Sequence, residues 1–519
     1  MLPEFTNELL TDFNNPANVK AFQTALDKVK AEIGATYPLV INGEHITLDQ
    51  AFDSVNPARP SEIIGKFADG NADHADQAIE SASEAYKTWQ YVPVEERSRY
   101  LLRAAAEMRR RRHEFSAMMV LEVGKNWAEA DADTAEAIDF LEYYARDMVR
   151  LANSSERLTA YTPEQLTFQY IPLGVGAVIP PWNFPNAIAA GMIGASLVAG
   201  NTVVFKPAEQ SPWIGWKICE LYWNNGIPKG VLNYLTGPGE VVGARMVEHP
   251  QTRFIAFTGS REVGVGIYET AARLQPGQKW LKRSILEMGG KDAIVVDESA
   301  DLEEAAQGIV ASAFGFQGQK CSAGSRAIVV ESVYDEVAKR VVELAKDIKI
   351  GATDGGADVY LGPVIDPEAF AKITGYIDLG KDEGELLLGG DKYENSDNGY
   401  FVQPTIFGKV DRNARIAREE IFGPVLSIIP AKDFNDAIAI ANDTEYGLTG
   451  AVYSNSRENL EKARREYYVG NLYLNRKCTG AFVGVHPFGG FNMSGTDSKA
   501  GGPDYLLLFT QAKSTAEKL

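Results

Sequence analysis

The sequence predicts an α/β protein made of two doubly wound units, and two observations lead to that fold class. Between residues 175 and 273, short apolar stretches alternate with helical stretches of about ten to fifteen residues, which is typical of parallel strands joined by helices. From Asp292 the same alternation begins again. With 519 residues, the chain is also too long for a single simple core. We therefore expect two large domains.

The part up to about residue 150 is expected to begin with a short β-rich segment at 39–44. Long amphipathic helices should follow, because apolar residues recur at three- and four-residue spacing in 75–90 and 95–119. The four arginines at 109–112 follow an Ala-rich stretch with glutamates on either side. We interpret them as a solvated helix face. A polar, extended stretch around 153–170 then interrupts the helices.

The two alternating units contain six predicted strands in all. In the first unit the strands are 175–179, 202–205, 231–235 and 254–257, with helices at 186–199, 211–224, 240–248 and 261–273. In the second unit the strands are 293–296 and 327–330, with helices at 301–314 and 333–347. Residues 287–290 join the two units, so we expect Glu287 to lie beside a cleft between them, where the carboxyl ends of parallel strands form ligand sites.

Composition excludes several classes of function. The net charge of −19 argues against nucleic-acid binding, which needs clustered cations. No apolar run approaches the roughly 20 residues that span a bilayer, so we expect no membrane partner. The five histidines lack ligand spacing, and no metal is predicted. The three cysteines form no disulfide or zinc pattern, which favours a reducing compartment, the cytoplasm.

Two segments carry groups suited to covalent chemistry on a carbonyl. Cys321 stands between Lys320 and Ser322, and Glu287 precedes Met288 and a glycine pair. A thiol can act as a nucleophile, and a carboxylate can activate the water that releases an acyl product. Each residue alone also has a structural interpretation, as a buried cysteine or as the end of a strand. A cysteine-dependent acyltransferase or hydrolase would use the same two groups.

Two predicted strand ends are candidates for nucleotide binding. After the strand at 254–257, Gly259, Ser260 and Gly264 lead into a helix, whose amino end suits a pyrophosphate. A purely structural N-cap at Ser260 is the alternative. After the strand at 202–205, Lys206 and Glu209 are placed to bind ribose hydroxyls, and a glutamate there favours NAD over NADP.

Taken together, six motifs in order along nearly the whole chain resemble the aldehyde dehydrogenase superfamily. They are Pro181-Trp182-Asn183-Phe184-Pro185, Phe257-Thr258-Gly259-Ser260, Glu287-Met288-Gly289-Gly290-Lys291, Gln319-Lys320-Cys321, Glu420-Ile421-Phe422-Gly423-Pro424 and Pro487-Phe488-Gly489-Gly490. Within that superfamily, residues 475–481 and 483–490 resemble the branch that oxidises L-glutamate γ-semialdehyde. Cys478 departs from the resemblance, since an apolar residue is expected there, and it is a candidate for oxidation.

The resemblance implies a Rossmann-like NAD-binding domain, a catalytic domain and a small β oligomerisation arm. The implied limits are 1–150 and 172–286 for the NAD-binding domain, 287–490 for the catalytic domain, and 151–171 with 491–519 for the arm. A homo-oligomer, a dimer or higher, is therefore expected.

The resemblance also assigns roles to individual residues. The implied catalytic residues are Cys321 as nucleophile, Glu287 as base, and Asn183 as an oxyanion donor together with the Cys321 backbone N–H. The implied NAD-binding residues are Ile179, Pro181, Trp182, Lys206, Glu209, Gly259, Ser260, Gly264, Glu420 and Phe422. The implied substrate-binding residues are Phe184, Lys320, Ser322, Gly480, Ala481 and Phe488.

The expected activity is the NAD-dependent oxidation of L-glutamate γ-semialdehyde, the open form of 1-pyrroline-5-carboxylate, to L-glutamate in proline catabolism. The reaction would pass through a cysteine thiohemiacetal and a thioester. An alternative is another small aldehyde substrate, such as succinic semialdehyde. A non-catalytic protein of the same fold is less favoured, because no proposed catalytic group is missing.

Overall fold

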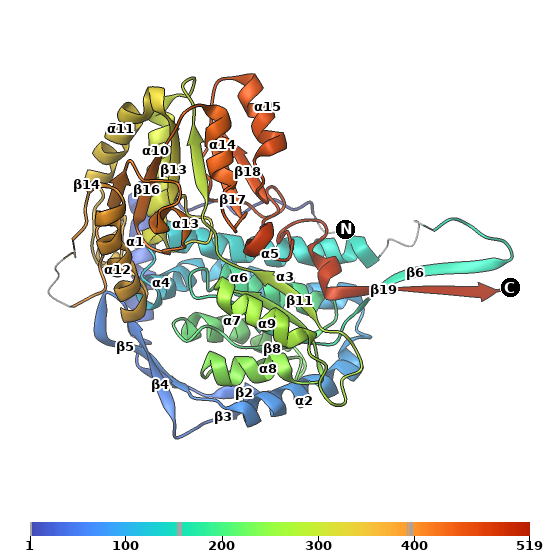
Figure 1. Cartoon of the computed structure of the whole chain (residues 1–519). Coiled ribbons are helices and arrows are strands. Elements are labelled where there is room, and N and C mark those ends of the chain that lie inside the picture. The colour runs from blue at the N-terminus through green and yellow to red at the C-terminus, as the bar shows by residue number, and fades with distance from the viewer. Residues whose placement is uncertain (1–2, 153–157, 392, 394–397) are drawn as a thin grey trace.

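A computed structural model describes residues 3–152, 158–391, 393 and 398–519 of the chain. Its main features are two seven-stranded sheets, a helical N-terminal part and a two-stranded arm (Figure 1). No helix among these residues is long and apolar enough to cross a membrane.

The first sheet has the strand order β11-β10-β7-β8-β9-β2-β3. Its strands are β11 (Arg283–Glu287), β10 (Thr252–Thr258), β7 (Val175–Ile179), β8 (Thr202–Phe205), β9 (Leu232–Tyr234), β2 (Leu39–Ile41) and β3 (Glu44–Ile46). The five strands from β11 to β9 are parallel, and β2 and β3 continue the sheet in antiparallel pairing. The connecting helices are α6 (Ala187–Val198), α7 (Pro212–Asn224), α8 (Ala244–Glu248) and α9 (Arg261–Ala272).

The second sheet has the order β14-β15-β16-β13-β12-β17-β18, and only the β14–β15 pair is antiparallel. Its strands are β14 (Glu385–Leu388), β15 (Thr405–Gly408), β16 (Val425–Ala431), β13 (Arg326–Val330), β12 (Ala293–Val296), β17 (Thr449–Tyr453) and β18 (Asn471–Leu474). Its helices are α10 (Leu302–Phe314), α11 (Tyr334–Lys346), α12 (Pro367–Glu383), α13 (Arg415–Arg418), α14 (Phe434–Asn442) and α15 (Arg457–Glu466). Two doubly wound α/β units are thus confirmed.

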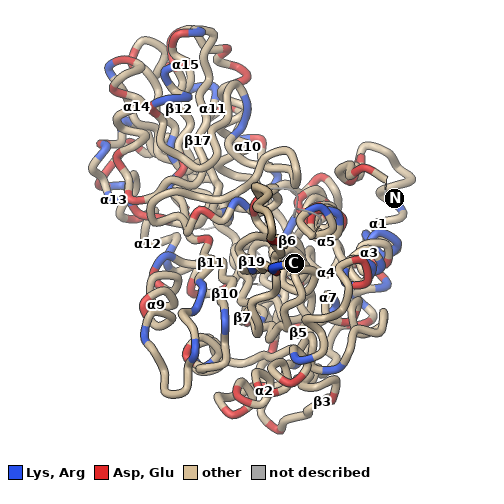
Figure 2. The backbone as a smooth tube through the Cα atoms, turned by 90° about the vertical axis from the view of Figure 1, so that its right-hand side faces the viewer, with Lys and Arg blue, Asp and Glu red and all other residues tan. Residues whose placement is uncertain are grey.

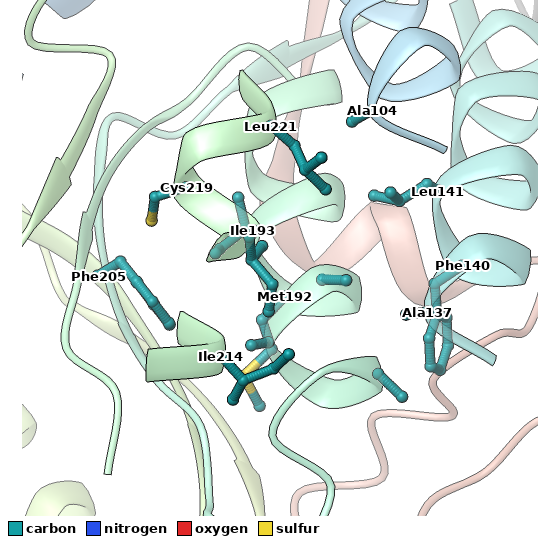
Figure 3. Packing of buried hydrophobic residues seen from close by; sticks show 14 of the residues in the cluster. Ala104, Ala137, Phe140, Leu141, Met192, Ile193, Phe205, Ile214, Cys219 and Leu221 are labelled. Carbon is teal, nitrogen blue, oxygen red and sulfur yellow. The ribbon is translucent and has the colours of Figure 1, made fainter. Parts of the chain in front are cut away.

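The N-terminal part adds helices and a small sheet to the first unit. The helices are α1 (Pro16–Lys30), α2 (Ala72–Trp89), α3 (Val94–Arg110), α4 (Arg112–Glu122) and α5 (Trp127–Ala152), and the sheet has the order β1 (Ala35–Tyr37), β5 (Arg59–Ala68), β4 (Ala51–Asn56). Figure 3 shows α6 at the centre of this core, with Met192 and Ile193 between Leu141 of α5 and Ile214 of α7. Helix α6 is apolar on every side, as expected for a helix that is buried all round.

The arm consists of β6 (Glu164–Pro172) and β19 (Thr510–Lys518). The two strands pair antiparallel along their full length, from Thr510 opposite Pro172 to Lys518 opposite Glu164. The arm projects from the body of the molecule in Figure 1 and points towards the viewer in Figure 2. The predicted domain limits around it stay a prediction, and residues 153–157 of the predicted extended stretch lie outside the described residues.

Several predicted elements differ from the structure. The helix expected over 95–119 is two helices, α3 and α4, separated at Arg111, whose φ of −105° and ψ of 19° leave the helical region. The helix expected at 240–248 begins with a π-helical turn at Gly239–Gly243. Glu287, expected in the connection between the two units, is the last residue of a strand, β11, as the alternative interpretation of it as a strand end had it.

The four arginines at 109–112 are not simply a solvated face. The side chain of Arg110 is 66% exposed, whereas that of Arg112 is 15% exposed and is paired with Asp131 at 2.6 Å. Arg109 binds Glu8 and Glu142. Figure 2 shows cations and anions mixed around these helices. Arg109 and Arg112 therefore bind acidic groups on other elements, and Arg111 lies 3.8 Å from Glu220 of α7.

Candidate active site

Four adjacent parallel strands of the first sheet end at the segments predicted to bind nucleotide or catalyse the reaction. β7 ends at Ile179 before Pro181 and Trp182, β8 ends before Lys206, β10 ends before Gly259, and β11 ends at Glu287. The chain runs from β7 through β8 to β9 on one side and returns with β10 on the other side of β7. This reversal of strand order is where ligands bind in open α/β sheets.

Lys206 and Glu209 form an ion pair just beyond β8. Lys206 Nζ lies 2.9 Å from Glu209 Oε1 and 3.3 Å from the carbonyl oxygen of Pro207. The lysine is buried, whereas the glutamate side chain is 41% exposed. A donor and an acceptor thus lie side by side, as the hydroxyls of a ribose require.

The turn from β10 into α9 has a structural role whether or not it binds a phosphate. The Ser260 hydroxyl accepts a hydrogen bond from Val263 N at 3.3 Å, so Ser260 is the N-cap of α9. Gly264 packs against Met288, and a Cβ there would lie 2.5 Å from the Met288 sulfur. The glycine therefore lets α9 pack closely on Met288.

Cys321 follows a strained turn at the end of α10. Phe316, Gln317 and Gly318 have φ values of 49°, 57° and 66°. Non-glycine residues seldom adopt this left-handed region, and such strain clusters at functional sites. Gln317 holds the turn by donating to the carbonyl oxygens of Gly124 at 3.1 Å and Pro363 at 2.8 Å.

Asn183 lies against this turn. Its side-chain amide donates to the carbonyl oxygen of Gln319 at 3.0 Å, two residues before the thiol. An amide has two N–H donors, so a second donor is available for an oxyanion near Cys321.

The glycines after Glu287 allow three segments of the site to meet. A Cβ at Gly289 would collide with the Glu420 carboxylate, and one at Gly290 would collide with the carbonyl oxygen of Cys321. The backbone N–H of Gly290 also donates to Glu420 Oε1 at 2.9 Å. The glycine pair thus brings Glu287, Cys321 and Glu420 close together, which no larger residue would permit.

Burial raises the pKa of both proposed reactive groups, Glu287 and Cys321. Burial raises the pKa of Glu287 to about 8, and its carboxylate accepts a hydrogen bond from Ser498 Oγ. Burial raises the pKa of the Cys321 thiol as well, and the nearby carboxyls of Asp292, Glu287 and Glu420 add to the effect.

Lys320 is not free to lower the pKa of Cys321. Its Nζ lies 2.6 Å from Glu129 Oε1, and both charges are largely shielded from solvent. Glu129 belongs to α5 and lies 191 positions earlier in the chain. Sequence reasoning missed it, because no local pattern marks a partner so distant.

The aromatic residues of the predicted site also have a partner that sequence reasoning missed. Lys125 is fully buried, and its Nζ lies 3.8 Å from the centre of the Phe184 ring and 4.6 Å from that of Phe316. Asp133 neutralises it at 2.9 Å. The cation contacts both rings and orders them beside the turn that carries Cys321.

Phe422, predicted to hold the nicotinamide ribose, has a φ of 59°. Its ring meets the Trp182 ring edge to face, with centroids 5.6 Å apart. A bulky residue in the left-handed region is an outlier that the surroundings must enforce. The contact between Phe422 and Trp182 joins the second unit to the segment that follows β7.

The loop at 475–490 contains the remaining predicted substrate residues. Arg476 donates to the carbonyl oxygens of Thr479 at 2.8 Å and Gly480 at 3.0 Å, and the φ of 78° at Gly480 forms the turn before Ala481. Phe488 is half-buried and pairs through its backbone with Ala500. Cys478 is fully buried, with its thiol 3.4 Å from the carbonyl oxygen of Ser322, so it lies beside the residue that follows Cys321 and is shielded from oxidants.

Comparison with known proteins gives consistent results. The chain matches the aldehyde dehydrogenase family over residues 45–515. The chain belongs to this family. It is 58% identical, over the full length of both chains, to 1-pyrroline-5-carboxylate dehydrogenase of Geobacillus sp. (strain WCH70).

Two solved structures show the same fold. 1-pyrroline-5-carboxylate dehydrogenase from Thermus with bound NAD is 52% identical, with full coverage of both chains and a TM-score of 0.98. Proline utilization A from Bdellovibrio bacteriovorus is 47% identical with a TM-score of 0.97, and 99% of this chain matches 53% of that one. The fold class, the NAD cofactor and the aldehyde dehydrogenase activity expected from the sequence are confirmed.

Proposed function

We propose that this enzyme oxidises L-glutamate γ-semialdehyde to L-glutamate with NAD, in proline catabolism. The ion pair of Lys320 and Glu129 beside Cys321 is the observation that carries the proposal. This substrate has both an α-carboxylate and an α-ammonium group, and a lysine next to a glutamate offers each of them an opposite charge. The name of the Geobacillus relative, 58% identical over the full length, supports the same substrate.

The geometry supports the following roles. Cys321 attacks the aldehyde carbon, while the Asn183 amide and the Cys321 backbone N–H stabilise the oxyanion of the thiohemiacetal. When bound, NAD would accept the hydride that the thiohemiacetal carbon loses as it becomes a thioester carbonyl. Glu287 then takes a proton from the water that hydrolyses the thioester, which releases the acid and restores the thiol.

The kinetic test compares L-glutamate γ-semialdehyde with succinic semialdehyde. We expect a higher kcat/KM with the first, because succinic semialdehyde has no ammonium group for Glu129. A higher kcat/KM with succinic semialdehyde would overturn the substrate assignment. The thiol and base alone would also suit an acyltransferase or hydrolase, but family membership gives that reading no support.

Glu129→Gln tests the ammonium contact directly. We expect the preference for L-glutamate γ-semialdehyde over succinic semialdehyde to fall about tenfold, because a charged hydrogen bond is lost. Asp147→Asn is the matched control, since Asp147 is also an acidic residue of α5 but pairs with Arg150 at 2.7 Å, away from Lys320. An unchanged preference in Glu129→Gln would remove the ammonium contact from the proposal.

We also infer a homo-oligomer assembled through the β6–β19 arm, whose β19 side chains are mostly exposed. An isolated two-stranded sheet is marginally stable in water, so a second copy of the chain is its natural partner. A cytoplasmic location fits the need of Cys321 for a reducing environment.

A further inference from the structure

Residues 3–14, which we call the N-terminal strap, form an extended segment that contains no helix or strand. It precedes residues 45–515, over which the family match extends. Figure 1 shows the N-terminus beside α5. The strap therefore adds something to the fold that the common family sequence does not include.

Two buried aspartates on α5 anchor the strap. Asp131 accepts from the backbone N–H and the hydroxyl of Thr11, both at 2.7 Å. Asp139 accepts from the Asn7 amide and from the backbone N–H of Glu8, both at 2.8 Å. Asp131 and Asp139 are eight helical residues apart, which is about 12 Å, and the four extended residues from Asn7 to Thr11 span about the same distance. The anchor residues of the strap therefore match the spacing of the aspartates on α5.

The strap also contacts the loop that contains Gly480 and Ala481. The Asn7 amide donates its second hydrogen bond to the carbonyl oxygen of Val483 at 2.9 Å. The Asn7 amide thus uses both of its N–H donors, one to bind α5 and the other to bind the loop.

A second contact lies next to the first. The Phe5 ring packs edge to face on Tyr143 of α5, with centroids 5.3 Å apart. Gly484 rests on these two rings, because a Cβ there would lie 3.2 Å from Phe5 and 3.1 Å from Tyr143. Its φ of 76° also requires a glycine. The turn after Ala481 is therefore shaped to fit the strap.

We propose that the N-terminal strap is a positioning element for substrate binding, with Asn7 as its key residue. Asn7 fixes Val483, and through it the turn at Gly480 and Ala481, the two residues that the family resemblance assigns to substrate binding. This role rests on the function proposed above. On the other side of the same turn, Arg476 holds the carbonyl oxygens of Thr479 and Gly480. The strap and Arg476 together define the shape of the loop.

The test compares Asn7→Ala with Thr11→Val in the full chain. Thr11 is the matched control, since it bonds the same strap to the same helix without touching the loop. For Asn7→Ala we expect KM for L-glutamate γ-semialdehyde to rise about three- to tenfold, the value of one hydrogen bond. The kcat and the KM for NAD should stay within about twofold, because none of the described hydrogen bonds joins residues 482–486 to Cys321 or to the predicted NAD-binding residues. Thr11→Val should leave all three constants near those of the wild type.

Hydrogen exchange supplies a readout that needs no substrate. Backbone amides at 482–486 should exchange faster in Asn7→Ala and in Phe5→Leu, but not in Thr11→Val. Unchanged exchange in the first two variants would overturn the proposal, as would an equal KM increase in Thr11→Val. If the wild type prefers succinic semialdehyde, the proposed substrate is wrong, and the exchange data still decide whether the strap orders the loop.

Discussion

The carboxyls around Cys321 are the main finding at the scale of single residues. Asp292, Glu287 and Glu420 all raise the pKa of the thiol, in addition to burial. The thiol is therefore protonated in the ligand-free protein at neutral pH. Forming the thiolate requires a base nearby, and Glu287 becomes ionised only as the pH approaches about 8.

This arrangement predicts a pH dependence for the wild type. A raised pKa means that Glu287 is protonated, and inactive as a base, over most of the range below about 8. We expect kcat to rise with pH towards that value and then level off. In Glu287→Gln, a burst of NADH should precede a steady rate that is lower by about 10²–10⁴-fold and lacks this rise. Stopped-flow absorbance at 340 nm measures both phases, and full steady-state rates in the variant would contradict the role.

Cys321→Ala should abolish oxidation, with a loss of about 10³-fold or more, because the thiol proposed to form the thiohemiacetal is removed. Binding of NAD, followed by calorimetry, should be nearly unchanged. Cys219→Ala is the control, since Cys219 is a buried residue of α7 packed near Phe205 (Figure 3). Oxidation that survives in Cys321→Ala would show that the nucleophile lies elsewhere.

Residues marked by a local motif were predictable, and residues that act through distant contacts were not. Cys321 and Glu287 stand among glycines that the structure needs for close packing of the backbone. Glu129, Lys125 and Asn7 occupy ordinary helical or polar surroundings in the sequence. Glu129 and Asn7 act through partners more than a hundred positions away, and Lys125 contacts rings of other elements, at Phe184 and Phe316; periodicity reveals none of these contacts.

At the scale of elements, buried parallel strands were the easiest to predict. The strands at 175–179, 202–205 and 293–296 coincide with β7, β8 and β12, because each is a continuous apolar run bounded by turns. β11 was not predicted, since only Ile285 and Leu286 of its residues are buried and its first residues are polar. The break at Arg111 was also missed, because neither glycine nor proline marks it.

The turn between α10 and Cys321 gives a prediction at this scale. Gly318→Ala should destabilise the protein by at least about 1–3 kcal/mol, because of the left-handed φ at this position. A Cβ there would also collide with the carbonyl oxygen of Gly423, so kcat should fall as the turn shifts.

The matched control lies in the middle of α12. Gly375 is exposed, and a Cβ there meets no atom of the described residues within 4 Å. Gly375→Ala should therefore stabilise the protein by about 0.5–1 kcal/mol and leave activity unchanged. Thermal unfolding and kcat of both variants check the pair. If Gly318→Ala had the stability and the kcat of the wild type, the strained turn would be unimportant for both.

At the scale of the whole molecule, the sheets explain how distant motifs meet. Strands β7, β8, β10 and β11 end at one edge of the first sheet, and the glycine pair after β11 brings in the turn of Cys321. The alternation of strands and helices predicted both units. The contact between the units was not predictable from alternation alone, since it depends on Gly289, Gly290 and Phe422.

The arm gives the last prediction, which concerns assembly. β6 and β19 pair over nine residues and extend from the body of the molecule (Figure 1). Such a sheet needs a covering surface to be stable, and a second copy of the chain supplies one.

Thr515→Pro should break the arm, because proline removes a backbone donor and fits poorly in a strand. Thr515→Val is the control, since valine favours strands. Light scattering should give a multiple of 56.7 kDa for the wild type and Thr515→Val, and a smaller mass for Thr515→Pro. An unchanged mass in Thr515→Pro would place the interface on another surface.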